Sequence, residues 1–391
     1  MRFHCIRSFI LLFLVASLFY ACGPKGSDTA EVNIDVDAFK SYAIDVNASK
    51  TPIFELIESV ELMMLEETDE SLLSYVTYME EADDGFVFTS RNEGDIYFYT
   101  KEGQYKSKIN RQGDGPEEYS EITSYWVERQ MICVYTRKSA TVKCYDFQGN
   151  FKKENKLSDH GDQLIPYRNG YVMDMGGSPV QDSLNYYINM LDSSFNTDTL
   201  LLSFDVVHQV SFSSTLNGFK AYKEGLTYLR TQGDSVFYLN GNAVKPLMHF
   251  DFGSQWLWND EKLLDDNQGV FEAMQTRGLV WGMGVKVGER WVYLTYLSDY
   301  KDAKGLMVNR YSGKYYLLDK RNGIEQNYTI VGLQWMGDRL LMSIGSDEVA
   351  DFLSELEDDQ WRFRNGTTLE AIESSEHRAM MWVKFRDSTA N

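Results

Sequence analysis

An internal repeat limits what this chain can fold into more than any other feature. Residues 85–105 and 131–151 align without gaps at an offset of 46 positions, from 85 to 131. Each copy has two short strand-like runs followed by a turn with a glycine, Gly103 in one copy and Gly149 in the other. A period in the forties is typical of β-propeller blades, small sheets that must stack on their neighbours to bury both faces.

Weaker copies continue along the chain until six units can be counted. Their strand-like runs lie at 170–174 with 186–192, 225–229 with 236–241, 291–295 with 306–313, and 338–343. The pattern predicts an all-β, six-bladed β-propeller, because the rival fold, a β-sandwich, does not require a recurring unit of this length. Residues 54–65 and 380–385 are strand-like but lie outside the units. We expect them to share the last blade and so close the ring.

Two stretches follow helical periodicity and predict two short helical insertions. The apolar face of the first is formed by Leu263, Leu264, Val270, Phe271 and Met274, with Gly278 as its stop. The second is expected to have Ser346 as N-cap and Val349, Phe352, Leu353 and Leu356 as its apolar stripe. The first helix lengthens the connection between the fourth and fifth blades. We expect it to pack over one propeller face as a partial lid.

The N-terminus predicts export. Arg2 and Arg7 precede an apolar run over residues 9–19, which is too short to span a bilayer, and Ala21 precedes Cys22. This pattern resembles the lipobox of bacterial lipoproteins, in which the cysteine is acylated. The alternative is an ordinary signal peptide cut nearby, with Cys22 incidental.

The lipoprotein reading divides the chain into three parts. Residues 1–21 are a signal peptide, 22–50 a lipidated polar tether and 51–391 the propeller. The protein is expected to be anchored to a membrane, the outer membrane in particular, by its lipid alone. The sequence does not decide between the periplasmic face and the cell surface. Without Arg2 and Arg7, 36 of the 38 basic residues face 58 acidic ones. Such a surface repels phosphate backbones, so nucleic acid is excluded as a partner.

The segment 97–119 carries a resemblance to a known family. A strand ending in a charged turn precedes a Gly-x-Gly-Pro-x-Glu-Tyr loop, whose matching residues are Gly113, Gly115, Pro116, Glu118 and Tyr119. The chain thereby resembles a family of six-bladed β-propeller lipoproteins of the bacterial envelope, and the strands around 60–65 and Trp382 are similar too. The resemblance implies the fold and the lipid anchor. It implies no activity and no catalytic residues.

The same loop is a candidate binding site. Its glycines permit close backbone approach, and Arg111, Glu117, Glu118 and Tyr119 offer recognition groups. The alternative, which we favour, is that the loop only locks adjacent blades together. Trp256 and Trp258, next to the first helix, are candidate stacking residues for a glycan.

Motifs for chemistry are not found in the sequence. The histidines of the mature chain have no short metal-ligand spacing, and no nucleophile elbow, P-loop or dinucleotide fingerprint occurs. No metal and no cofactor are therefore expected. A non-catalytic scaffold that binds a protein or glycan of the envelope is favoured. The alternatives are a propeller hydrolase or lyase, with polar groups converging at the central channel, and a glycan-binding module.

Cys133 and Cys144 are predicted to lie directly opposite each other on adjacent strands. At the 46-residue offset they replace Val87 and Phe98, so the pair is expected to pack between blades. An oxidising compartment favours a disulfide, whereas the spacing of cross-strand Cβ atoms opposes one. On balance the sequence favours two adjacent free thiols, with the disulfide as the alternative.

Overall fold

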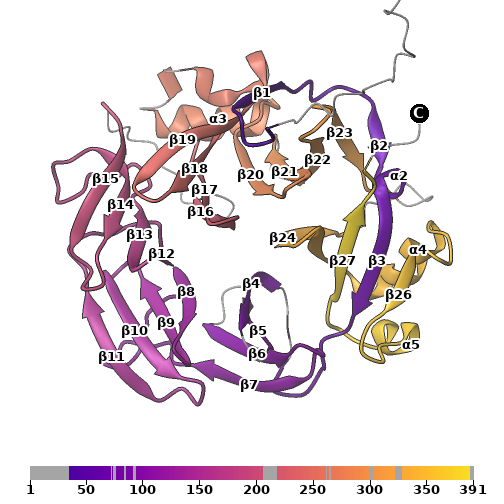
Figure 1. Ribbon diagram of the computed structural model, residues 1–391, viewed down its shortest axis with the longest axis horizontal. Coiled ribbons are helices and arrows are strands. Elements are labelled where there is room, and N and C mark those ends of the chain that lie inside the picture. The colour runs from indigo at the N-terminus through magenta and orange to yellow at the C-terminus, as the bar shows by residue number, and fades with distance from the viewer. Residues whose placement is uncertain are drawn as a thin grey trace, which may run out of the picture. The chain divides into compact units, whose positions relative to one another are not determined.

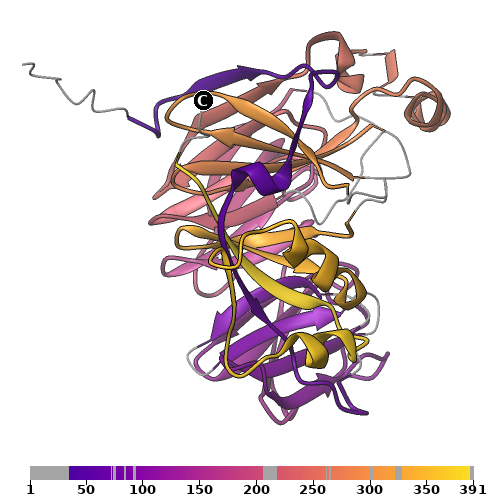
Figure 2. The ribbon, with the colours of Figure 1, turned by 90° about the vertical axis from the view of Figure 1, so that its right-hand side faces the viewer.

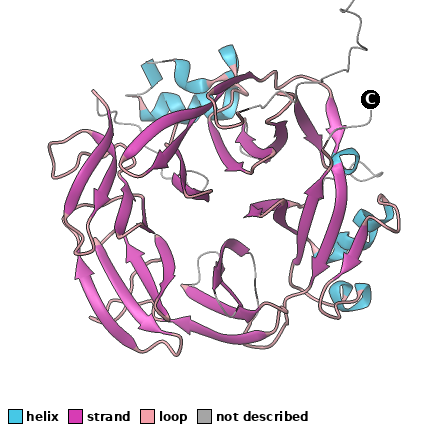
Figure 3. Cartoon of the chain, in the orientation of Figure 1, coloured by secondary structure: helices cyan, strands magenta, loops and turns pink. Residues whose placement is uncertain are grey.

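Six small sheets are arranged as the blades of a ring (Figure 1). The structure is a computed structural model that describes residues 35–71, 73, 76–82, 85–90, 94–205, 218–260, 262–263, 266–298, 303–321 and 328–387. The predicted signal peptide and Cys22 lie outside these residues. Strands dominate, with a few short helices (Figure 3). The prediction of an all-β, six-bladed propeller is confirmed.

Blades 1, 2 and 3 have four strands each in simple up-and-down order. Blade 1 consists of β4 (Val76–Ala82), β5 (Gly85–Ser90), β6 (Asp95–Thr100) and β7 (Tyr105–Asn110). Blade 2 consists of β8 (Ser124–Glu128), β9 (Met131–Thr136), β10 (Thr141–Asp146) and β11 (Phe151–Lys156). Blade 3 consists of β12 (Gln163–Tyr167), β13 (Gly170–Asp174), β14 (Tyr186–Leu191) and β15 (Thr197–Ser203).

Blades 4 and 5 each gain a fifth, outer strand from the N-terminal segment. Blade 4 consists of β16 (Gly218–Tyr222), β17 (Gly225–Leu229), β18 (Ser235–Asn240) and β19 (Ala243–Asp251), with β1 (Lys40–Ala43) parallel to β19. Blade 5 consists of β20 (Gly282–Val287), β21 (Trp291–Leu297), β22 (Ala303–Asn309) and β23 (Tyr315–Asp319), with β2 (Lys50–Pro52) parallel to β23. The sequence did not predict these two additions, which cover edges that would otherwise be open.

Blade 6 is built from both ends of the chain. Its strands are β24 (Val331–Met336), β25 (Arg339–Ile344), β27 (Ala379–Phe385), β3 (Ile57–Met63) and β26 (Trp361–Phe363). The N-terminal strand β3 pairs antiparallel with the C-terminal strand β27, and Figure 2 shows them side by side. The predicted closure of the ring is confirmed.

Each junction between neighbouring blades holds its own apolar cluster. The 46-residue repeat explains why: Val87 faces Phe98 in blade 1 as Cys133 faces Cys144 in blade 2. The first pair packs in the junction between blades 1 and 2, and the second in the junction between blades 2 and 3. Equivalent positions of the repeat therefore pack in successive junctions between blades, as the stacking of blades requires.

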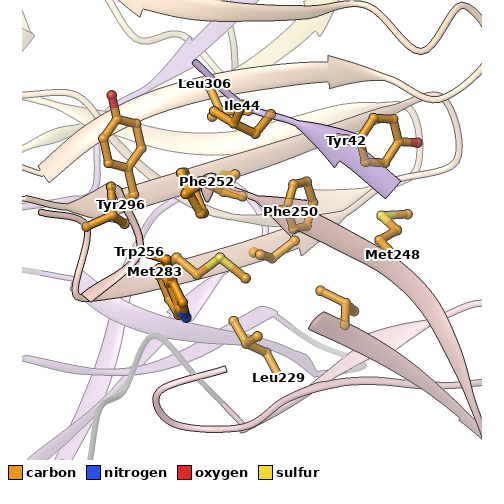
Figure 4. Close-up of a cluster of buried hydrophobic side chains, with 14 of the residues drawn as sticks. Tyr42, Ile44, Leu229, Met248, Phe250, Phe252, Trp256, Met283, Tyr296 and Leu306 are labelled. Carbon is orange, nitrogen blue, oxygen red and sulfur yellow. The ribbon is translucent and has the colours of Figure 1, made fainter. Parts of the chain in front are cut away.

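The first predicted helix is α3 (Asn267–Thr276), which begins later than expected because the Asp266 side chain accepts the Gly269 N–H as its N-cap. Leu263, Val270 and Met274 are buried, and Leu264 lies outside the described residues. Phe271 is 47% exposed, so its assignment to the buried face is wrong. The helix packs into the cluster between blades 4 and 5, part of which appears in Figure 4. Figure 1 places it at the rim of the ring and not over the centre.

The second predicted helix begins with a short 3-10 turn, Ser346–Glu348, and continues as α4 (Val349–Ser354). Its apolar stripe is buried as predicted. Ser346 is not its cap, because the hydroxyl donates to the carbonyl of Ser375. Two further short helices, α2 (Ile53–Leu56) and α5 (Leu369–Glu373), were not predicted. Among the residues described, no helix is long and apolar enough to cross a membrane.

Candidate functional site

The loop Arg111 to Tyr119 is held at both ends by its own side chains. The Tyr119 hydroxyl donates to the Gly94 carbonyl at 2.6 Å and accepts the Arg111 N–H at 3.0 Å. The Arg111 Nε donates to the Gly149 carbonyl of blade 2 at 2.8 Å. Tyr119 is 1% exposed, and burial raises the pKa of its phenol to about 12. The phenol therefore stays neutral and serves as a structural donor.

Blade 2 fastens the middle of the same loop. Lys143 Nζ donates to the carbonyls of Pro116, at 2.9 Å, and Glu118, at 2.6 Å. The Tyr145 hydroxyl donates to the Glu117 carbonyl at 2.8 Å. These contacts support the favoured reading of the sequence, a lock between blades 1 and 2.

A shallow pocket of about 210 Å³ lies beside this loop. Arg111, Glu117 and Glu118 contribute to its lining. The Glu118 carboxylate is engaged locally, because it accepts the Gly115 N–H at 2.8 Å. The loop therefore leaves few groups directed at a ligand.

Trp256 and Trp258 are core residues, which corrects their assignment as stacking residues for a glycan. They are 5% and 8% exposed. Trp256 stacks on Phe252, with ring centroids 5.5 Å apart, and Trp258 Nε1 donates to the Trp281 carbonyl at 2.7 Å. Figure 4 shows Trp256 among the apolar side chains of this cluster. The apolar residues around α3 bury these rings.

Cys133 and Cys144 are paired as predicted and joined by a disulfide. Their Cα atoms lie 4.0 Å apart, closer than the ordinary spacing across an antiparallel pair. The expectation that strand spacing would keep the thiols apart is therefore wrong. The strands approach each other closely enough for the bond to form within the apolar cluster between blades 2 and 3.

The strands nearest the axis are tied together by hydrogen bonds between a side chain of one blade and the backbone of another. Glu80 accepts the Val127 N–H (3.1 Å), Ser124 donates to the Leu164 carbonyl (2.7 Å), Gln163 accepts the Phe219 N–H (2.6 Å), and Trp335 donates to the Lys286 carbonyl (2.8 Å). These four hydrogen bonds brace the channel side of the ring, and the groups that form them are used for assembly.

Three lysines form a separate feature in blades 4 and 5. Burial, followed by the charges of Lys220 and Lys320, lowers the pKa of Lys286 to about 7. Burial also lowers the pKa of Lys220 to about 8. Lys286 and Lys320 lie on one aromatic ring, with Nζ atoms 5.8 and 6.0 Å from the Tyr293 centroid. The amines of Lys286 and Lys220 therefore lose part of their charge near neutral pH. In the part of the chain described, no group of three or more His, Cys, Asp or Glu side chains could hold a metal.

A pocket of about 320 Å³ opens where blades 5 and 6 meet. It is lined by Glu289, Arg290, Trp291, Tyr311, Trp335, Gly337, Asp338, Lys384, Phe385 and Asp387. These residues come from the turns β20–β21, β22–β23 and β24–β25, from the adjoining ends of β21 (Trp291) and β24 (Trp335), and from the chain around the end of β27. We call this feature the blade 5–6 pocket. Sequence reasoning missed it because its residues belong to separate turns that only the closed ring brings together.

The floor of the blade 5–6 pocket is aromatic and its rim is charged. Trp335 packs near Phe385, with ring centroids 6.2 Å apart. Arg290 lies over the Tyr311 ring at 4.6 Å and pairs with Asp387 at 2.9 Å. Five of the ten lining residues are charged, so this pocket is more polar than the mainly apolar clefts that hold most small molecules.

Comparison with known proteins places the chain in a family. The family model described as Domain of unknown function (DUF4934) matches residues 32–384. No curated protein matches. The similar solved structures include two from Bacteroides. A presumed exported protein of Bacteroides fragilis NCTC 9343 has a TM-score of 0.67 and 14% identity, over 89% of this chain and 99% of that chain. A DUF4221 family member of Bacteroides vulgatus has a TM-score of 0.48 and 11% identity, over 85% and 97%.

The likeness to the Bacteroides fragilis protein agrees with the ring of blades seen in this chain. The first of the two structures shares the fold along nearly its whole length. The family model covers every blade, from before β1 to the last residues of β27. The chain therefore belongs to the DUF4934 family, a family of unknown function whose fold in this protein is a six-bladed β-propeller.

Proposed function

We propose that this protein is an exported lipoprotein of the outer membrane whose propeller is a non-catalytic binding scaffold. The lipid is attached to Cys22, and the ligand is held in the blade 5–6 pocket. The signal-like N-terminus and the presumed export of the similar Bacteroides fragilis protein support the location.

The observation that carries the binding role is the composition of the blade 5–6 pocket. Aromatic rings and charged groups from turns of two blades gather around one space of about 320 Å³. The backbone beneath is braced, since Trp335 Nε1 donates across the junction to the Lys286 carbonyl at 2.8 Å. A rigid framework that presents loop residues is a common arrangement for recognition.

Metabolic labelling tests the anchor. Cells that express the full-length protein are grown with radioactive palmitate, and the protein is isolated. We expect label on the native protein and on Cys5→Ser, because Cys5 leaves with the signal peptide, and none on Cys22→Ser. Label that persists on Cys22→Ser, or a Cys22→Ser protein that stays with membranes after a high-salt wash, contradicts the lipoprotein assignment.

Site-specific crosslinking tests the binding role in intact cells. A p-benzoylphenylalanine residue replaces Tyr311 in the blade 5–6 pocket or, as a control, Phe271 on α3; these side chains are 36% and 47% exposed. We expect a light-dependent shift in mass only with the probe at position 311. No shift there, or the same shift at both positions, contradicts a binding site in the pocket.

A further inference from the structure

We propose that the blade 5–6 pocket binds an uncharged carbohydrate. This inference rests on the proposed function and adds the chemical class of the ligand. Three features of the pocket carry it: a fixed aromatic wall, cations that are paired with carboxylates, and a buried indole donor without a partner in the described structure.

The aromatic wall is preorganised. Trp335 is only partly buried, yet its indole N–H is bound to the Lys286 carbonyl. One ring face lies against Gly288, where an added Cβ would come within 2.8 Å of the indole carbons. Tyr311 is 36% exposed under the Arg290 guanidinium. The apolar C–H faces of sugar rings pack on flat aromatic surfaces, and rings that are already ordered lose little entropy when they bind.

The charges of the rim favour an uncharged, hydroxyl-rich ligand. Arg290 is paired with Asp387 at 2.9 Å, and Lys384 lies 2.7 Å from Glu58 and 3.8 Å from Asp338. An anionic ligand would meet cations that already have carboxylate partners, beside the further carboxylate of Glu289 in the lining. A sugar hydroxyl both donates and accepts, so it can bridge an ammonium or guanidinium and a carboxylate without disturbing the pair.

The buried donor is the indole of Trp291, which is 3% exposed. Within the described part of the chain, its Nε1 has no hydrogen-bond partner. A buried N–H without an acceptor is costly. Trp291 lines the pocket but its Nε1 is shielded from solvent, so an acceptor oxygen of a ligand reaches it only when the surrounding side chains move. The rim remains open to solvent, because the side chains of Asp338 and Asp387 are 69% and 71% exposed. One unit of a longer glycan could therefore enter the pocket.

A glycan array followed by titration tests the inference. The mature protein is applied to an array of neutral oligosaccharides, uronic-acid oligosaccharides and sialylated oligosaccharides. The neutral glycans that are retained are then titrated by calorimetry. We expect Tyr311→Ala to weaken their binding about tenfold, as the loss of one aromatic contact implies. Asp338→Ala, at an exposed rim position, should also weaken it. Phe271→Ala removes an exposed aromatic outside the pocket and should leave affinity unchanged.

Two outcomes would overturn the inference. One is that no neutral glycan binds, or that charged glycans bind better. The other is that neutral glycans bind equally to native protein and Tyr311→Ala. If crosslinking at position 311 succeeds in either case, the pocket still binds a ligand, and only its assignment to uncharged carbohydrate fails. A crosslinked peptide at that position would identify a protein ligand instead.

Discussion

At the scale of residues, single buried polar atoms join neighbouring parts of the ring. The Tyr135 hydroxyl of blade 2 donates to the Gly161 carbonyl, which precedes blade 3. The Tyr228 hydroxyl of blade 4 donates to the Asp174 carboxylate of blade 3. Burial raises the pKa of Tyr135 to about 12, so its phenol remains a donor at neutral pH. Each of these bonds satisfies a group that is costly to leave unpaired.

Tyr119→Phe tests the lock between blades 1 and 2. The substitution removes the hydroxyl that donates to Gly94 and accepts from Arg111 while keeping the ring. We expect the free energy of unfolding, measured by urea titration, to fall by about 1–3 kcal/mol. Tyr311→Phe, at a partly exposed site, should change it by less than about 0.5 kcal/mol. Equal effects of the two substitutions would contradict the lock.

Asp174 should make stability depend on pH. Burial raises its pKa from 3.8 to about 7, against the hydrogen bonds from Gly176 and Tyr228, which favour the carboxylate. The folded protein keeps the proton that the unfolded chain releases. The stabilising contribution is therefore complete below pH 3.8 and declines up to about pH 7, by at most ~1.4 kcal/mol per pH unit.

Asp174→Asn removes this titration and keeps the shape of the side chain. Urea titrations of both proteins from pH 4 to 8 measure the effect. The stability of the variant relative to the native protein should rise with pH up to about 7 and then level off. A difference that stays constant across the range would show that Asp174 is already ionised in the folded state.

At the scale of elements, the N-terminal segment is fastened to blades 4 and 5 by a buried arginine. Arg310 is 0% exposed. Its Nη2 donates to Asp37 Oδ1 at 2.9 Å and to the Val36 carbonyl at 2.6 Å, and its Nη1 donates to the Gly288 carbonyl at 2.9 Å. Burial alone would raise the pKa of Asp37, but hydrogen bonds from Lys223, Tyr222 and Arg310 lower it to about 2.

Asp37→Ala should loosen this segment, because it leaves the Arg310 charge buried without its partner. We expect a loss of about 3 kcal/mol in unfolding free energy, the low end for a broken buried pair, since Asp37 is partly exposed. Asp37→Ala combined with Arg310→Met should recover part of the loss. If the double variant is less stable than Asp37→Ala alone, the buried charge is not the cause.

The disulfide is tested by mass spectrometry of the non-reduced protein treated with an alkylating reagent. Cys133 and Cys144 should carry no label, and reduction before alkylation should add two. We also expect reduction to lower stability by about 2–4 kcal/mol, since the bond constrains the unfolded chain. Two labelled thiols without reduction would show that the disulfide is absent and that the cysteines are free thiols, as the ordinary spacing of strands favours.

The sequence predicted the elements whose pattern is local or repeated. The register of Cys133 against Cys144, the pairing of the terminal strands and the stripe of α4 all follow from alternation, repeat and helical period. The parallel strands β1 and β2 could not be predicted, because segments of three or four mostly polar residues carry no strand pattern. Trp256 was misread because an aromatic ring near a helix fits an exposed site or a core equally well.

At the scale of the whole molecule, ring closure creates the candidate site. The terminal strand β3 completes blade 6 next to β27, and the chain just beyond β27 reaches the turns of blade 5. Arg290 of blade 5 and Asp387 near the C-terminus meet only because the ring is closed. The residues of the pocket lie far apart in sequence, so their juxtaposition depends on the topology of the complete propeller.

Hydrogen exchange with mass spectrometry tests most directly that the ligand binds between blades 5 and 6. The mature protein is compared with and without a saturating neutral oligosaccharide retained on the array. Slower exchange is expected in peptides that cover 288–291, 310–314 and 335–338, with no change over 111–120. Protection confined to 111–120, or to the strands that surround the channel, would contradict the account. It would move the binding site to the loop from Arg111 to Tyr119 or to the propeller axis.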